Sequence, residues 1–305
     1  MTAPRPAPLG LGTAPLGNLF TSITDEESDA TIRAAWQAGV RWFDTAPQYG
    51  HGLAEVRLGR VLRELPRADV AVVSKVGRLL RAVSPRPPTI FCDVPDVDPV
   101  FDFSRDGVLR SIEESLGRLG VDRLDVVHVH DPDEHERQAV EEAFPTLVEL
   151  RRQGVIGAVG CGMNQWEMLQ RFVREVDLDC VLLAGRYSLL DRSGVPLLDD
   201  CAVRGVRVIL GGVFNSGLLA HPAVGATFDY EAARPELLAQ AVEMQRVCAD
   251  FGVSLPAAAI QFGRRHPAVS TVLFGARSAA EVVADVEYAA APLPDELWPA
   301  LEAIR

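Results

Sequence analysis

The sequence predicts a single-domain α/β protein folded as a closed (β/α)8 TIM barrel. Three observations predict this fold: eight short apolar runs, a helical pattern after each run, and a length of 305 residues, which is typical of one such barrel. The runs are uniformly apolar rather than alternating, as expected for parallel strands that helices cover. No Gly/Ser-rich linker interrupts the chain, so we expect one domain over residues 1–305.

The expected strands are rich in β-branched and aliphatic residues. They cover residues 9–14, 40–45, 70–75, 124–130, 155–161, 180–184, 206–210 and 269–274. Thr24 and Glu27 are spaced as a capping box at the start of the first helix, and Ser104 is an N-cap for the third. Glycines 39, 120 and 154 stand where helix C-caps are expected. A last helix is expected over residues 295–304.

The connection over residues 77–103 is far longer than the usual two to six or so residues. It holds five prolines and the aromatic residues Phe91, Phe101 and Phe103. Its position after the third strand places it on the C-terminal rim of the barrel, where loops carry function. We expect a substrate lid there, with a disordered insertion as the alternative.

Composition narrows the possible partners and the compartment. A net charge of −12 argues against nucleic acid or an anionic membrane as a partner. No apolar run approaches the roughly 20 residues that span a bilayer, and residues 1–8 lack the apolar core of a signal peptide. The five cysteines are scattered without a CxxC pair, which favours reduced thiols. We expect a cytoplasmic protein that is a monomer or a small homo-oligomer.

Four polar residues are expected to meet at the C-terminal ends of adjacent strands. Asp44 ends the second strand, Tyr49 lies in the loop after it, Lys75 ends the third strand and His130 ends the fourth. Each one alone has an ordinary structural explanation, as a helix cap, a solvated strand end or a core histidine. Because the C-terminal ends of barrel strands converge on one site, the four together indicate an active centre.

These residue types fit proton transfer to or from an oxygen. A phenol with a pKa of about 10 is a poor acid or base near neutrality, and a neighbouring ammonium is expected to lower that pKa. Asp44 would keep Lys75 charged, and His130 would orient a carbonyl oxygen. Since no side chain delivers hydride, the reaction implies a nicotinamide cofactor.

Ordered motifs along the chain resemble those of the aldo-keto reductase superfamily. They are GLGTAPLG, FDTAPQYGHG, VVSKVG, DVVHVHDPD, VIGAVGCGMNQWE and FGARSAAEV. The resemblance is greatest to the branch of D-threo-aldose 1-dehydrogenase (L-fucose dehydrogenase)-like and pyridoxal 4-dehydrogenase-like proteins. It implies a (β/α)8 barrel that binds NADP or NAD, with Asp44, Tyr49, Lys75 and His130 as the catalytic tetrad and Tyr49 as the general acid/base.

The resemblance also assigns a cofactor site. The positions that match it are Thr13, Ala14, Asn164, Phe214, Asn215, Ser216, Gly217, Leu218, Gly275, Ala276, Arg277, Ser278, Glu281 and Asp285. Arg277 offers a partner for a 2′-phosphate, whereas Glu281 would repel one. These opposed charges predict that both NADP and NAD are used.

The expected reaction is oxidation of C1 of an aldose to the lactone, or interconversion of a small aldehyde or ketone and its alcohol. The alternative within the same branch is a pyridoxal 4-dehydrogenase-like activity. Aromatic side chains of the long loop, Phe91 and Phe101, are expected to pack on a sugar ring, and His51 is expected to meet its hydroxyl groups.

Three other interpretations are less favourable. GLGTAPLG has the spacing GxGxxxxG and fails the dinucleotide fingerprint. The HxH pair His128 and His130 suggests a metal-dependent hydrolase, but no histidine ends a later strand to complete the site, so no metal is expected. A cofactor-binding regulatory subunit without turnover would not need the complete tetrad.

Overall fold

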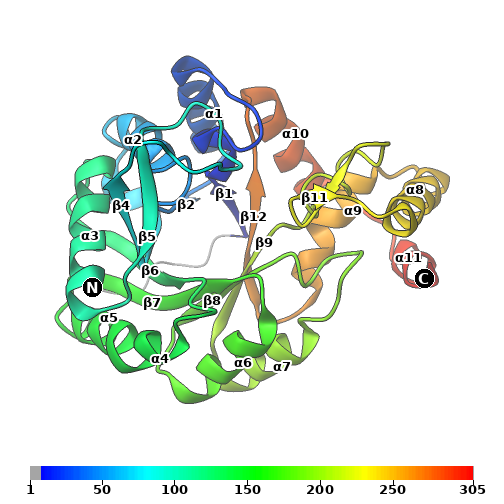
Figure 1. The fold of residues 1–305 in the computed structure, drawn as a ribbon. Helices are drawn as coiled ribbons and strands as arrows, with labels where there is room; N and C mark the ends of the chain where they lie inside the picture. Colours follow the sequence, from blue (N-terminus) through cyan, green and yellow to red (C-terminus); the bar gives the residue numbers. More distant parts are fainter. Residues whose placement is uncertain (1–7, 305) are drawn as a thin grey trace.

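The computed structural model describes residues 8–304, and within this range eight parallel strands close a barrel (Figure 1). The barrel strands are β1 (Leu9–Gly12), β2 (Trp42–Asp44), β3 (Ala71–Val76), β6 (Leu124–His130), β7 (Ile156–Met163), β8 (Cys180–Ala184), β9 (Arg207–Gly211) and β12 (Val269–Gly275). Their order around the barrel is β1-β12-β9-β8-β7-β6-β3-β2, and β1 also pairs with β2. Each expected apolar run overlaps one strand, so the predicted fold class is confirmed.

Helices surround the strands on the outside of the barrel (Figure 1). They are α1 (Asp25–Gln37), α2 (Leu53–Leu62), α3 (Arg105–Leu119), α4 (Glu136–Gln138), α5 (Phe144–Arg152), α6 (Trp166–Glu175), α7 (Val195–Arg204), α8 (Pro235–Asp250), α9 (Leu255–Phe262), α10 (Ala279–Ala290) and α11 (Leu297–Glu302). Short turns of 3-10 helix are η1 (Ala14–Gly17), η2 (Arg67–Asp69) and η4 (Gly263–Arg265), and η3 (Ala139–Ala143) is a π-turn. No helix between residues 8 and 304 is long and apolar enough to cross a bilayer.

Side-chain chemistry at the helix ends agrees with the sequence. The Thr24 hydroxyl accepts from the backbone N–H of Glu27 at 3.1 Å, and the Glu27 carboxylate accepts from that of Thr24 at 2.7 Å, which completes the capping box. Ser104 caps α3, which ends at Gly120 in the left-handed conformation. The last helix, α11, covers Leu297–Glu302 and is shorter than the expected span of residues 295–304.

The long connection over residues 77–103 contains regular structure. β4 (Arg78–Ala82) pairs antiparallel with β5 (Val97–Phe101), which gives a β-hairpin. His51 holds this hairpin, since its Nδ1 lies 2.6 Å from the Val97 carbonyl oxygen. Phe91 is buried beneath it and forms an isolated β-bridge with Leu19.

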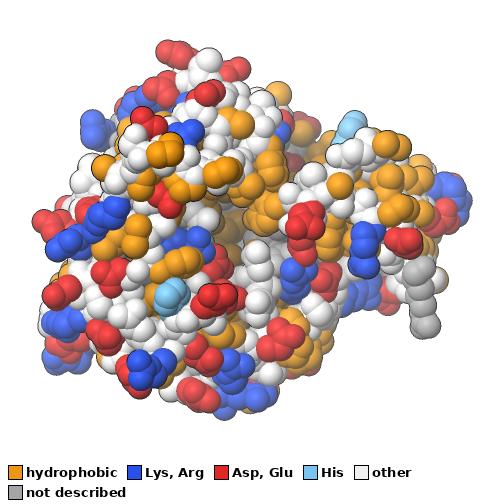
Figure 2. All heavy atoms as spheres, in the orientation of Figure 1, with side chains coloured by type: hydrophobic (Ala, Val, Ile, Leu, Met, Phe, Trp, Pro, Cys, Tyr) orange, Lys and Arg blue, Asp and Glu red, His pale blue; other side chains and the backbone are white. Residues whose placement is uncertain are grey.

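A second insertion between β9 and α8 was not identified from the sequence. It carries the short antiparallel pair β10 (Thr227–Phe228) and β11 (Glu231–Ala232). Figure 2 shows that this face is hollowed between the β4–β5 hairpin and the region of β11, with hydrophobic side chains gathered around the hollow. The two insertions therefore flank the opening of the barrel.

Gly77 joins β3 to the β4–β5 hairpin where no larger residue fits. Its φ is +103°, and a Cβ at this position would lie 2.1 Å from the ring of Phe103, which is fully buried. Both the backbone conformation and the close approach require glycine.

We therefore expect Gly77→Ala to lower the free energy of unfolding by roughly 2–4 kcal/mol, from left-handed strain and overpacking together. The matched control is Gly117→Ala in α3, where nothing lies within 4 Å of the new Cβ. That change should be neutral or stabilising by up to about 1 kcal/mol. Urea unfolding of both variants measures the difference, and equal midpoints would contradict the assignment.

Candidate functional site

Strand periodicity brings three polar side chains into the barrel. Trp42 and Val73 belong to the cluster that fills the barrel interior, and side chains two residues apart on a strand point to the same face. Asp44 on β2 and Lys75 on β3 therefore face inward as well. His130 ends β6, which pairs with β3, so the three adjacent strands place these groups together as predicted.

Lys75 and Asp44 form a buried ion pair. Lys75 Nζ donates to Asp44 Oδ1 at 2.5 Å and to the Thr45 carbonyl oxygen at 2.9 Å, and the two side chains are 1% and 2% exposed. Burial lowers the pKa of Lys75, but Asp44 and the Tyr49 phenol raise it by more, so the net shift is upward. Lys75 is therefore a fixed cation.

Tyr49 lies in the turn after β2, with the ammonium of Lys75 4.7 Å from its ring centroid. Burial raises its pKa and Lys75 lowers it, and burial prevails, which leaves the pKa at about 12. Lys75 thus lowers the pKa of the phenol as expected, but desolvation is the larger effect, so the net shift is upward. Tyr49 is a protonated phenol at neutral pH.

His130 faces Tyr49 edge-on, with ring centroids 6.0 Å apart at 90°. Burial, and then the cations Arg78 and Lys75, hold the pKa of His130 well below its usual range. The imidazole is therefore neutral at pH 7 and carries one N–H. A neutral imidazole and a protonated phenol together offer two hydrogen-bond donors to one oxygen atom.

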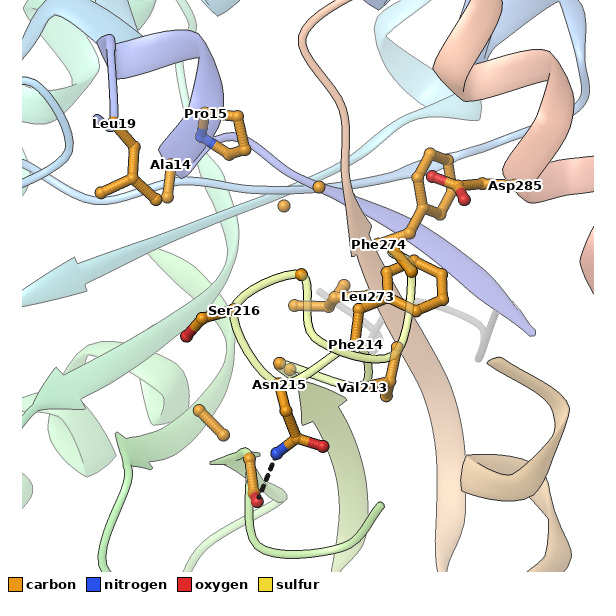
Figure 3. A pocket seen from close by; sticks show the side chains of 18 of the residues that line it. Ala14, Pro15, Leu19, Val213, Phe214, Asn215, Ser216, Leu273, Phe274 and Asp285 are labelled. Carbon is orange, nitrogen blue, oxygen red and sulfur yellow. Dashed lines mark hydrogen bonds between the residues drawn. The ribbon is translucent and has the colours of Figure 1, made fainter. Parts of the chain in front are cut away.

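A cavity of about 500 Å³ starts at Asp44 and Tyr49 and extends to Asp285 and Tyr288 on α10. Figure 3 shows Ala14, Pro15 and Leu19 on one side of it and the loop with Phe214 and Asn215 on the other. Asn215 Nδ2 donates to the Gly185 carbonyl oxygen at 3.3 Å (Figure 3).

The lining suits a flat, polar, extended ligand. On the cavity wall, Asp44 Oδ2, Asn215 Oδ1 and Arg277 Nε are among the buried side-chain atoms that have no hydrogen-bond partner in the described residues, whereas buried polar atoms normally have one. Glycines at positions 12, 185, 211, 212, 217 and 275 line the wall and leave backbone groups accessible. Orphaned polar atoms and accessible backbone fit a dinucleotide.

Most of the predicted cofactor residues line this cavity. Those on its wall are Ala14, Asn164, Phe214, Asn215, Ser216, Gly217, Gly275, Arg277, Glu281 and Asp285. Four lie behind the wall. Thr13 donates its backbone N–H to the Asp44 carbonyl oxygen, Leu218 and Ala276 are buried in the core, and Ser278 caps α10 by accepting from the N–H of Glu281.

The structure does not bring the predicted substrate residues to the cavity. His51 is buried between Val97 and Thr89, and Phe91 packs edge-on against His51. Phe101 is half-exposed and stacks on Phe103. These side chains stabilise the β4–β5 hairpin, so their expected contact with substrate has no support in this geometry.

Two other aromatic residues occupy the mouth of the cavity. Phe20 and Tyr230 both line it, with ring centroids 6.2 Å apart. Both have a positive φ, 61° and 66°, which is uncommon for bulky residues and is found where surrounding structure holds the backbone. The sequence analysis did not identify Tyr230 as a residue of the site. The unusual length of the connection between β9 and α8 is the sequence feature that could have indicated it.

The histidine pair and the cysteines show no sign of metal ligation. Over residues 8–304, no group of three or more His, Cys, Asp or Glu side chains is placed to hold a metal ion. His128 is fully buried, and neither of its ring nitrogens has a hydrogen-bond partner in the described part of the chain. All five cysteines are free, and four of them are buried.

Comparisons with known proteins identify the family of the chain. Residues 8–305 match the model of the aldo/keto reductase family. The chain is 42% identical to a pyridoxal 4-dehydrogenase of Microbacterium luteolum, over 96% of this chain and 92% of that protein. It is 40% identical to a D-threo-aldose 1-dehydrogenase of a Pseudomonas species, over 97% and 93%.

Among solved structures, the holo form of aldo-keto reductase AKR11C1 from Bacillus halodurans has a TM-score of 0.80 at 22% identity, over 100% of this chain and 94% of that one. At this identity the likeness shows the fold. The family resemblance predicted from the sequence motifs is confirmed by the family match and the two relatives.

The buried histidines predict loss of stability in acid. Burial holds the pKa of both His128 and His130 well below 6.5, so below about pH 6.5 the unfolded chain binds more protons than the folded one. The two neutral histidines therefore leave the free energy of unfolding unchanged above that pH. Below it, the free energy of unfolding falls by up to about 1.4 kcal/mol per pH unit for each histidine. Urea unfolding at pH 7.5 and 5.5 measures the loss.

Imidazole NMR shifts provide a direct check. Neither ring should titrate between pH 8 and 5 in the folded protein. Protonation of either buried ring near pH 6.5 would contradict the prediction.

Proposed function

The chain belongs to the aldo/keto reductase family and is an oxidoreductase, and from that premise we propose that it oxidises C1 of a free aldose to the lactone with a nicotinamide cofactor. The observation that carries this proposal is the Lys75–Asp44 ion pair beside Tyr49 at one end of the cavity. The relative that is a D-threo-aldose 1-dehydrogenase supports an aldose as the substrate.

Each member of the tetrad has a separate role in the proposal. In oxidation, Tyr49 as phenolate takes the proton of the C1 hydroxyl, and His130 donates a hydrogen bond to the same oxygen. Lys75 stabilises the phenolate, and Asp44 holds Lys75 in place. A nicotinamide cofactor bound in the cavity would supply the acceptor for the hydride of C1. In the reverse direction the protonated phenol is the acid.

Pyridoxal is the second candidate substrate. The relative with 42% identity is a pyridoxal 4-dehydrogenase, and the same tetrad could act on an oxygen of that substrate. A panel of aldoses, pyridoxal and small aldehydes, assayed by NAD(P)H absorbance, separates the two candidates. No turnover of any of them would instead favour a non-catalytic cofactor-binding protein.

We propose NAD as the preferred cofactor, although both cofactors should bind. Among the residues on the cavity wall, Arg277 is the cation, while Glu281 and Asp285 are carboxylates at the α10 end. The Glu281 carboxylate accepts from the backbone N–H of Arg277 at 2.7 Å. Burial and the charge of Glu281 raise the pKa of Asp285 to about 7. A 2′-phosphate would meet this negative charge.

We also propose a cytoplasmic location and a monomer or small homo-oligomer. The five free cysteines favour a reducing compartment such as the cytoplasm. A small-molecule substrate suits a monomer or a small homo-oligomer, without a nucleic acid or membrane partner.

Removal of the Tyr49 hydroxyl tests the central role. We expect Tyr49→Phe to fold and to bind NADH as the wild type does, while kcat falls roughly 10²–10⁴-fold, as is typical when a general acid or base is lost. Tyr187→Phe is the matched control, because Tyr187 packs against Phe262 and His266 away from the tetrad. Near wild-type turnover by Tyr49→Phe would refute the assignment.

Two variants at the α10 end test the cofactor preference. Arg277→Ala should weaken NADPH binding roughly tenfold or more and NADH binding far less, since only NADPH brings a 2′-phosphate to the guanidinium. Glu281→Gln should shift the preference towards NADPH while it keeps an acceptor for the Arg277 N–H. Quenching of protein fluorescence gives both dissociation constants, and equal losses for Arg277→Ala would mean that the side chain is only structural.

A further inference from the structure

An ion pair outside the tetrad lies directly beside His130. Arg78 Nη2 donates to Asp131 Oδ2 at 2.7 Å, and the same carboxylate oxygen is 3.5 Å from His130 Nε2. The carboxylate of Asp131 is therefore next to His130, the proposed donor to the reacting oxygen.

The fold holds both members in unusual ways. Asp131 follows the last residue of β6, has a φ of 43°, and donates its backbone N–H to the Gly162 carbonyl oxygen at 3.0 Å. A non-glycine residue in this conformation is favoured at functional sites where surrounding contacts fix it. At Asp131 the backbone turns away from the direction of β6. This turn places the Asp131 carboxylate close to His130.

The β4–β5 hairpin supports the other member. Arg78 is the first residue of β4, and its guanidinium carbon lies 4.8 Å from the centroid of the Phe101 ring. Phe101 in turn packs on Phe103 and His135. The long connection thus reaches His130 through Arg78 and Asp131. Neither Arg78 nor the aromatic residues of the connection are among the residues that line the cavity.

The carboxylate of Asp131 keeps hydrogen-bonding capacity. Its side chain is 31% exposed, against 12% for Arg78. Within residues 8–304 no hydrogen bond reaches Asp131 Oδ1, whereas Oδ2 faces Arg78 and His130. Burial raises the pKa of Asp131 to about 6 and Arg78 lowers it, so the group is mainly an acceptor above neutral pH.

We propose that Asp131, held by Arg78, recognises the hydroxyl group on the carbon next to the reacting C–O carbon, so that the enzyme selects aldoses and other 2-hydroxy aldehydes. This inference rests on the proposed function, because it takes His130 Nε2 as the donor to the reacting oxygen. A substrate oxygen bound there is beside the Asp131 carboxylate. A hydroxyl one carbon away can then donate to Oδ1.

The same pair disfavours pyridoxal. Its ring hydroxyl is acidic and is attached one carbon further from the aldehyde carbon than the C2 hydroxyl of a sugar. In its ionised form it would bring a second negative charge towards Asp131, where like charges repel. Asp131 is therefore a specificity-determining residue, and Arg78 is a positioning residue that acts through it.

Substrate pairs that differ by one hydroxyl test the proposal. The first pair is D-arabinose and 2-deoxy-D-ribose, which is D-arabinose without its C2 hydroxyl, and the second is glycolaldehyde and acetaldehyde in the direction of reduction. The wild type should prefer the hydroxylated member in kcat/KM by roughly 10- to 100-fold, the range expected for one hydrogen bond to a charged group. Asp131→Ala should bring this ratio close to one, mainly through KM.

Controls separate recognition from loss of structure. Glu134→Ala removes an exposed carboxylate from the same loop and should leave the ratio as it is. Asp131→Asn keeps the shape of the side chain and should give an intermediate ratio. The dissociation constant for NADH, measured by fluorescence, and the circular dichroism spectrum should match the wild type in all three variants.

The possible failures are distinguishable. If Asp131→Ala turns over both members of a pair with the wild-type ratio, the inference is overturned and the proposed function stands. An equal loss for both members would show that Asp131 acts through His130, which also overturns it. If the wild type acts on no aldose or aldehyde, the proposed function fails, and the inference fails with it.

Discussion

The buried ion pair of Lys75 and Asp44 is the interaction on which the reactive end of the protein depends. Removing each charge from water costs several kcal/mol, so either side chain alone would be strongly destabilising at 1–2% exposure. Lys75 donates to Asp44 Oδ1 and to the Thr45 carbonyl oxygen, while Asp44 Oδ2 has no hydrogen-bond partner among the described residues. An apolar pair could fill the same space, but it would place no positive field beside Tyr49. The charge is therefore retained for its effect on the phenol.

Desolvation sets the protonation states around that pair. It raises the pKa of Tyr49 to about 12 in spite of the ammonium, and it holds the pKa of His130 well below its usual range. Both groups are therefore hydrogen-bond donors at neutral pH. This state is ready to protonate an oxygen, whereas oxidation first requires the phenol to lose its proton, a step that Lys75 makes less unfavourable. The same exclusion of water therefore keeps Tyr49 protonated and His130 neutral.

The residues of the candidate site come partly from the barrel strands and partly from the two insertions. The strands are buried on both faces and hold Asp44, Lys75 and His130, while Tyr49 lies in the turn after β2 and the two hairpins supply groups around them. The β4–β5 hairpin supports Arg78 beside Asp131, and the β10–β11 pair brings Tyr230 over the cavity. Three of the four tetrad residues are on the barrel strands, and the groups that we propose to select the substrate are on its loops, as is usual for this architecture.

The sequence by itself determined the barrel, the helix caps, and the meeting of Asp44, Lys75 and His130, because strand periodicity and the C-terminal ends of parallel strands are local and repetitive features. Only the tertiary structure decided that Phe101 packs on Phe103 and Arg78, that Tyr230 lines the cavity, and that burial outweighs the ammonium in setting the pKa of the phenol. Those outcomes depend on contacts between loops far apart in the chain and on how much water the closed barrel excludes, and neither is written in a local pattern of residues.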